Sequence, residues 1–276
     1  MAPPHSSQQN RRRAGLHAAS KSNGRRSLWF NWRRLVSRVA SPIIAVLIWQ
    51  FVCEMGWVAP QFLPAPSAIV LRGMSWAATA EFWGHLGITV YRLLLGLFIA
   101  VILGLALGLW AQFSRVSGAI INALVRLLAP IPKIALYPAL ILILGFENSS
   151  KIALVVADAL FPVLLATWAA ARTVDQKLIW SAQAAGTSRL RCIWKVTLPA
   201  ILPSVLAGVR VAAVIACVVV FLAEMIASTD GLGHLLTMAA RSYRTLDMFV
   251  PLIWICTLGL LLNTLIAFIQ HKVAHG

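Results

Sequence analysis

Long apolar segments alternate with short polar ones along most of this 276-residue chain. Each apolar segment has roughly 20 residues, which is the length that a helix needs to cross the hydrocarbon core of a bilayer. Short segments of alternating polarity, which are typical of a membrane barrel, are absent from the sequence. The pattern therefore predicts an all-α integral membrane protein with about six transmembrane helices, at residues 39–56, 86–111, 119–145, 151–171, 204–226 and 248–270.

The third apolar segment differs from the others because it is interrupted by Pro130, Pro132, Lys133 and Pro138. A proline cannot donate a backbone hydrogen bond, and inside a membrane the freed backbone groups need partners from protein or from a water-filled cavity. We therefore expect this span to be kinked or partly unwound.

Composition and charge agree with a membrane protein. The chain is 60% hydrophobic and only 12% charged, and its net charge is +16. Nine Lys and Arg residues and no acid precede residue 39, which places this end in the cytoplasm by the positive-inside rule. Six spans then place the C-terminus and the basic 172–203 segment on the same side. Topology and anionic lipid account for the positive charge, so nucleic-acid binding is not expected.

The sequence divides into two parts by this interpretation. Residues 1–38 are polar and basic and are expected to form a disordered cytoplasmic tail. Residues 39–276 are expected to form one six-span transmembrane domain.

Motifs for catalysis, cofactors and metals are not found. The four cysteines (Cys53, Cys192, Cys217 and Cys256) are far apart in sequence, and no Cys/His cluster indicates a metal site. The phosphate-binding pattern GxxxxGK[ST] and the zinc-protease pattern HExxH are missing as well. We therefore expect no cofactor, no metal and no enzymatic activity in the chain itself.

The 172–203 segment has an unusual pattern for a link between two spans. Residues 176–185 favour a helix, and Gly186 can adopt the left-handed conformation that ends one. In a second helix, Leu190, Ile193, Trp194 and Thr197 recur at the spacing of one helical face. Pro199 is expected to end this helix and Pro203 to begin the fifth span. Such an amphipathic segment can rest on anionic lipid or dock against a soluble partner, and the pattern alone favours neither.

The same segment resembles the cytoplasmic signature of ATP-binding-cassette importer permeases. That signature has Glu-Ala-Ala, three residues, Gly, nine residues and Ile-x-Leu-Pro. This chain has Ala182, Gly186 and, nine residues later, VTLP at 196–199, with Trp180, Ser181 and Val196 in place of the signature's Glu, first Ala and Ile. Residues 62–70, 130–164 and 223–236 are similar to permeases for nitrate, alkanesulfonates and taurine, so the resemblance covers roughly residues 40–270.

This resemblance implies a type I importer permease fold and a defined set of partners. These are a second permease copy, forming a homodimer, two cytoplasmic ATP-binding subunits and a periplasmic substrate-binding protein, all at a bacterial inner membrane. The cargo would be a small oxyanion such as an aliphatic sulfonate, taurine or nitrate. Coupling to the ATPases would involve Ala182, Gly186, Leu190, Ile193, Trp194, Leu198 and Pro199.

Charged residues inside apolar segments are costly and therefore indicate function or specific pairing. Lys133, Asp158 and Glu224 are the candidates for the translocation pathway, although both acids can instead bond a neighbouring span. Arg210 lies near the end of a span, where its side chain can reach the interface. Gly104 and Gly108 form a GxxxG spacing, which is typical of close helix packing.

Three alternatives to a sulfonate importer stay open from sequence. The chain could be a permease for a different small solute, or a membrane anchor or sensor partner that binds a soluble protein and moves nothing. A secondary transporter is disfavoured because no internal repeat relates residues 39–145 to 151–270.

Overall fold

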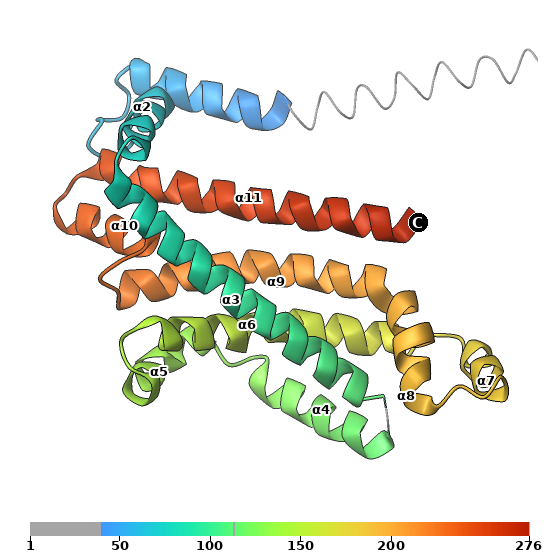
Figure 1. The fold of residues 1–276 in the computed structure, drawn as a ribbon. Coiled ribbons are helices and arrows are strands. Elements are labelled where there is room, and N and C mark those ends of the chain that lie inside the picture. The colour runs from blue at the N-terminus through green and yellow to red at the C-terminus, as the bar shows by residue number, and fades with distance from the viewer. Residues whose placement is uncertain (1–39, 113, 276) are drawn as a thin grey trace, which may run out of the picture. The chain divides into compact units, whose positions relative to one another are not determined.

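The computed structural model describes residues 40–112 and 114–275, and the regular elements within these ranges are all helices (Figure 1). The chain forms two units, one ending at Ala68 and the other beginning at Ile69. The predicted tail, residues 1–38, lies outside the described residues.

The described part of the first unit contains the apolar helix Ala40–Glu54 and the start of α2 (Pro66–Ala77). The Gln50 side chain accepts a hydrogen bond from the Ser67 backbone N–H (3.1 Å) and donates one to the Ser67 hydroxyl (2.9 Å), which ties the helix to the first turn of α2. This helix covers most of the predicted span at 39–56. As described it is too short to cross a bilayer unaided, since about 20 residues are required.

Four helices of the second unit are long and apolar enough to cross a membrane. They are α3 (Ala80–Trp110), α6 (Asn148–Ala171), the helix Leu190–Ile226, and α11 (Thr245–His275), of which Thr245–Val273 is apolar enough to span. A broken pair of helices can supply a fifth span. The described residues thus account for four or five of the six predicted spans.

The predicted interruption of the third span is confirmed. α4 (Arg115–Leu128) stops before Pro130, and the chain resumes in a 3-10 turn, η1 (Lys133–Leu136), and in α5 (Tyr137–Leu144). The two halves are bent by 81°. The prolines explain the break, since they remove backbone donors over a stretch of a few residues.

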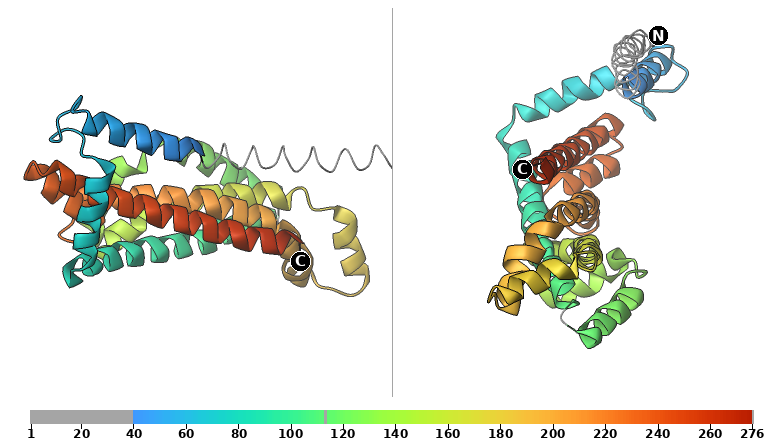
Figure 2. Two further views of the ribbon diagram at one scale, coloured as in Figure 1. Left: turned by 90° about the horizontal axis from the view of Figure 1, so that it is seen from above. Right: turned by 90° about the vertical axis from the view of Figure 1, so that its right-hand side faces the viewer.

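Small residues on α3 allow it to lie directly against α6, as the GxxxG spacing predicts (Figure 2). A Cβ atom added to Gly104 would lie 2.8 Å from Val163 Cβ, and one added to Gly108 would lie 2.6 Å from Thr167 Cβ. Gly208 allows α9 (Leu198–Ile226) the same close approach to Ala166 of α6. Glycine is therefore required at these positions by contact between helix backbones.

The prediction that Pro199 ends one helix and Pro203 begins the next is wrong. α8 (Arg189–Cys192) continues through a π-helical turn, η2 (Ile193–Thr197), into α9 (Leu198–Ile226), and Pro203 lies inside α9. In the π turn the Leu198 N–H bonds the carbonyl of Ile193, five residues back. This wider turn accommodates Pro199, whose ring would otherwise meet the preceding turn of an α-helix.

Two groups of short helices lie at opposite ends of the second unit (Figure 1). α5 and α10 (Leu232–Arg241) are at one end, and α7 (Gln176–Ala184) and α8 are at the other. The four long helices connect these ends, which are called the α10 end and the α8 end below.

Candidate functional site

The α8 end is formed by the 172–203 segment. Asp175 caps α7 by accepting a hydrogen bond from the Lys177 N–H (2.9 Å), and the helix ends with Gly186 at a φ of 84°. This left-handed conformation, predicted from sequence, reverses the chain so that α8 can begin three residues later. A pocket of about 290 Å³ lies between α7, η2 and the neighbouring ends of α3 and α6.

The four residues predicted to share one face of the second helix differ in their exposure. Thr197 is buried and Ile193 is half-buried, whereas Leu190 and Trp194 are each 65% exposed. Trp180 on α7 is exposed to a similar extent. Leu190 and Trp194 are one helical turn apart, so they form a small apolar surface on one face of the helix.

The helix that carries this surface is longer than a bilayer is thick. Leu190–Ile226 contains 37 residues, which corresponds to about 55 Å against a hydrocarbon core of about 30 Å. If it crosses the bilayer without a large tilt, part of this helix extends beyond the hydrocarbon core. Its α8 end, which carries the exposed tryptophan, is the polar and basic one.

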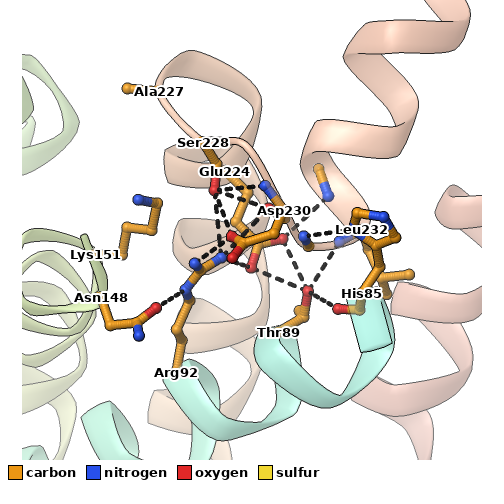
Figure 3. A network of polar contacts seen from close by, with 12 residues as sticks. His85, Thr89, Arg92, Asn148, Lys151, Glu224, Ala227, Ser228, Asp230 and Leu232 are labelled. Carbon is orange, nitrogen blue, oxygen red and sulfur yellow. Dashed lines mark hydrogen bonds and ion pairs between the residues drawn. The ribbon is translucent and has the colours of Figure 1, made fainter. Parts of the chain in front are cut away.

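The α10 end is held by a polar cluster, the Arg92 network, which consists of Thr89, Arg92, Asn148, Glu224 and Asp230 with their hydrogen-bond partners (Figure 3). Thr89, Arg92 and Glu224 are buried. The Arg92 guanidinium donates to Glu224 (2.9 Å), to Asn148 (2.8 Å) and to Asp230. The side chains of Arg92 and Glu224 are 2% and 0% exposed, so the ion pair lies entirely within protein. Buried charges persist when their partners satisfy them in this way.

Glu224 has two further donors besides Arg92. The Thr89 hydroxyl donates to it at 2.9 Å and the Gly233 N–H at 3.0 Å, while the Thr89 oxygen accepts from the Leu232 N–H at 2.9 Å. The network thus joins α3, the first turn of α6, the end of α9 and the start of α10 (Figure 3).

The turn between α9 and α10 is fixed by the same contacts. Gly231 has a φ of 96°, and its N–H donates to His85 Nδ1 (3.0 Å). Partial burial opposes ionisation of Asp230, but the hydrogen bond and positive charge of Arg92 prevail and hold the pKa of this carboxyl below its usual range. Asp230 is therefore ionised at neutral pH and binds Arg92 as a carboxylate.

A second ion pair lies within the spans, at the break between α4 and η1. Lys133 Nζ is 3.3 Å from Asp158 Oδ1 on α6, 3.2 Å from the carbonyl of Ala129, and 4.6 Å from the centre of the Phe161 ring. The side chains of Lys133 and Asp158 are 13% and 22% exposed. This pair is therefore more open than the Arg92–Glu224 pair.

The structure thus sorts the residues that the sequence singled out. Lys133 and Asp158, predicted separately, contact each other, and Glu224 lies apart from them and pairs with α3. Sequence reasoning missed Arg92, although it is a basic residue within the predicted span 86–111. The signal that could have found it is the need of an intramembrane acid such as Glu224 for a cationic partner.

Comparison with known proteins gives a consistent result. The family described as binding-protein-dependent transport system inner membrane component matches residues 94–275. The putative aliphatic sulfonates transport permease protein SsuC of Bacillus subtilis (strain 168) is 31% identical over 261 residues, which cover 95% of this chain and 93% of the relative.

Two relatives from Escherichia coli (strain K12) are similar as well. Its putative aliphatic sulfonates transport permease protein SsuC is 34% identical over 219 residues, covering 79% of this chain and 83% of the relative. Its taurine transport system permease protein TauC is 28% identical over 266 residues, covering 93% and 96%.

A solved structure also has this fold. A chain of the MetNI methionine ABC transporter in an inward-facing conformation superposes with a TM-score of 0.57 over 72% of this chain and 97% of that chain. At 20% sequence identity the likeness concerns the fold alone.

Proposed function

Because this chain belongs to the family of binding-protein-dependent transport system inner membrane components, we propose that it is a permease subunit that imports a small sulfonate at the expense of ATP hydrolysed by separate subunits. The observation that carries the cargo class is the similarity to permeases named for aliphatic sulfonates, which extends over 95% of the chain. A relative named for taurine, itself a sulfonate, supports the same class.

The exposed surface at the α8 end supports a proposal about the partners. Leu190 and Trp194 present an apolar surface on a helix that extends beyond the bilayer, which suits insertion into a groove of a soluble protein. The proposed partners at this end are two cytoplasmic ATP-binding subunits. A second copy of this chain would complete the pathway, and a periplasmic binding protein would deliver the sulfonate.

The experiment is uptake by the host cell. Deletion of the gene is expected to abolish uptake of radiolabelled ethanesulfonate or taurine and growth on that compound as sole sulfur source. Growth on sulfate serves as the control, and a plasmid copy should restore uptake. If uptake of both compounds is unchanged by the deletion, the cargo class is wrong.

The orientation is proposed from the basic residues: both termini and the 172–203 segment face the cytoplasm. In a chain whose four native cysteines are replaced, Ser188→Cys should react with a membrane-impermeant thiol reagent only after the cells are permeabilised. Ser67→Cys should react in intact cells. Both serines are exposed, so access through the membrane decides the result. Labelling of Ser188→Cys from outside would contradict the orientation.

A further inference from the structure

Lys133 occupies an unusual position for a charged residue in a membrane span. It begins η1, immediately after the break at Pro130 and Pro132, where the backbone is not a continuous helix. Non-helical backbone at membrane depth is tolerated where it is buried in protein or borders a wet cavity. In the isolated chain the side chains of Lys133 and Asp158 are 13% and 22% exposed, so the pair borders the surface of the single chain.

Two other cations within the described spans, Arg92 and Lys151, are committed to structural contacts. Arg92 is surrounded by Glu224, Asp230 and Asn148. Lys151 is buried and donates to the backbone carbonyls of Phe146 (2.6 Å) and Glu147 (3.1 Å). An anion could bind Arg92 or Lys151 only by breaking several short hydrogen bonds at once.

The contacts of Lys133 are fewer and longer. Its ammonium group is 3.3 Å from a single oxygen of Asp158, and its one other hydrogen bond is to a carbonyl at 3.2 Å. Charge-assisted hydrogen bonds of this type are normally about 2.7–2.9 Å long, so the pair is loosely made. Another anion could take the place of the carboxylate by displacing a single 3.3 Å contact, and it would leave the lysine paired.

We propose that Lys133 binds the sulfonate group of the cargo within the membrane, and that Asp158 is a counterion which the cargo displaces. This proposal rests on the proposed function, since it assumes a sulfonate cargo. Asp158 keeps the lysine paired between transport cycles, because an unpaired charge at this depth is unfavourable. The Phe161 ring, beside the ammonium group, offers an apolar surface to the alkyl part of the cargo.

Substitutions of Lys133 and of Asp158 are expected to change the affinity for the sulfonate in opposite directions. Binding of radiolabelled ethanesulfonate is measured on the purified complex of this chain with its ATP-binding subunits, without a binding protein. Lys133→Gln should weaken binding by about tenfold or more, since a charge-assisted hydrogen bond is lost. Asp158→Asn removes the competing anion and should tighten binding severalfold. The double variant should bind as weakly as Lys133→Gln.

A purely structural ion pair gives a different result, because breaking it from either side removes the same contact. If both single variants weaken binding, or if neither changes it, the proposal is wrong. If the wild-type complex binds ethanesulfonate and the two variants change binding equally, this proposal is wrong, but the proposed function still stands. Absence of ethanesulfonate uptake in wild-type cells would instead overturn the proposed function.

A second readout covers the case in which Asp158→Asn does not assemble. Phe161→Cys, in a chain with its native cysteines replaced, retains both charges and places a thiol beside the proposed site. Bound ethanesulfonate should slow its modification by a small neutral thiol reagent. Thr257→Cys, on an exposed part of α11, should be modified at the same rate with and without ethanesulfonate. Equal modification of Phe161→Cys in both conditions would contradict the proposal.

Discussion

Replacing Arg92 by methionine is expected to remove most of the folded chain from the membrane. Methionine fills a similar volume but leaves Glu224, whose side chain is fully buried, without its cationic partner. Removing one member of a buried ion pair destabilises proteins by about 3–5 kcal/mol, which is a large part of a typical folding free energy. The measurement is the amount of chain in purified membranes and its melting temperature in detergent.

Two further variants separate lost charge pairing from other effects of the Arg92 substitution. Arg210→Met is the matched control, because Arg210 also lies within a span but is exposed and bonds Asn263. It should leave the amount of protein unchanged. Adding Glu224→Leu to Arg92→Met should restore part of the lost protein, because no unpaired carboxylate then remains at that position. If Arg92→Met accumulates and melts like the wild type, the network does not stabilise the α10 end.

The second large effect is expected at the α8 end, where Trp194→Asp should prevent the ATP-binding subunits from co-purifying. Trp194 is 65% exposed, so the chain itself should fold and insert normally. If Trp194 is buried in a partner groove, a charge there costs several kcal/mol. Uptake should stop as a consequence of the lost contact.

Gly186→Val tests the geometry of the same surface. The φ of 84° places Gly186 in the left-handed region, where a β-branched residue is strongly disfavoured. An added Cβ atom has no neighbour within 4 Å, so the effect is expected to arise from the backbone conformation. α7 and α8 would then meet at a different angle, and retention of the ATP-binding subunits should fall.

Tyr243→Asp is the matched control, because Tyr243 is also an exposed aromatic residue but follows α10 at the opposite end. It should retain the ATP-binding subunits. A full complement of these subunits on both Trp194→Asp and Gly186→Val would contradict docking at this surface. It would favour the alternative that Leu190 and Trp194 rest on lipid.

Local features of the fold could be predicted from the sequence. The prolines at 130 and 132 predicted the break between α4 and η1, the glycines of α3 predicted close packing, and Gly186 predicted the left-handed turn. Each depends on a residue whose conformational or steric property acts within a few positions of itself. The continuity of α8 with α9 was missed because a π-helical turn, which has no clear sequence signal, accommodates Pro199.

Pairing between spans could not be predicted in the same way. Arg92 and Glu224 are 132 positions apart, and Lys133 and Asp158 lie on different helices, η1 and α6. A single sequence shows that intramembrane charges need partners but not which helices are neighbours. From the sequence alone, Glu224 and Asp158 were therefore equal candidates for the translocation pathway. The fold places Glu224 in the Arg92 network, and its role in the pathway stays a prediction.

The unbroken helix from Leu190 to Ile226 limits how a push on Trp194 can reach the other end of the protein. Glu224 is fixed near one end by three hydrogen-bond donors, and Trp194 lies 30 residues away, a distance of about 45 Å along the axis. The helix is therefore expected to tilt as a rigid rod about its end at the Arg92 network. By that geometry a tilt of about 5° would move Trp194 sideways by about 4 Å while Glu224 hardly moved.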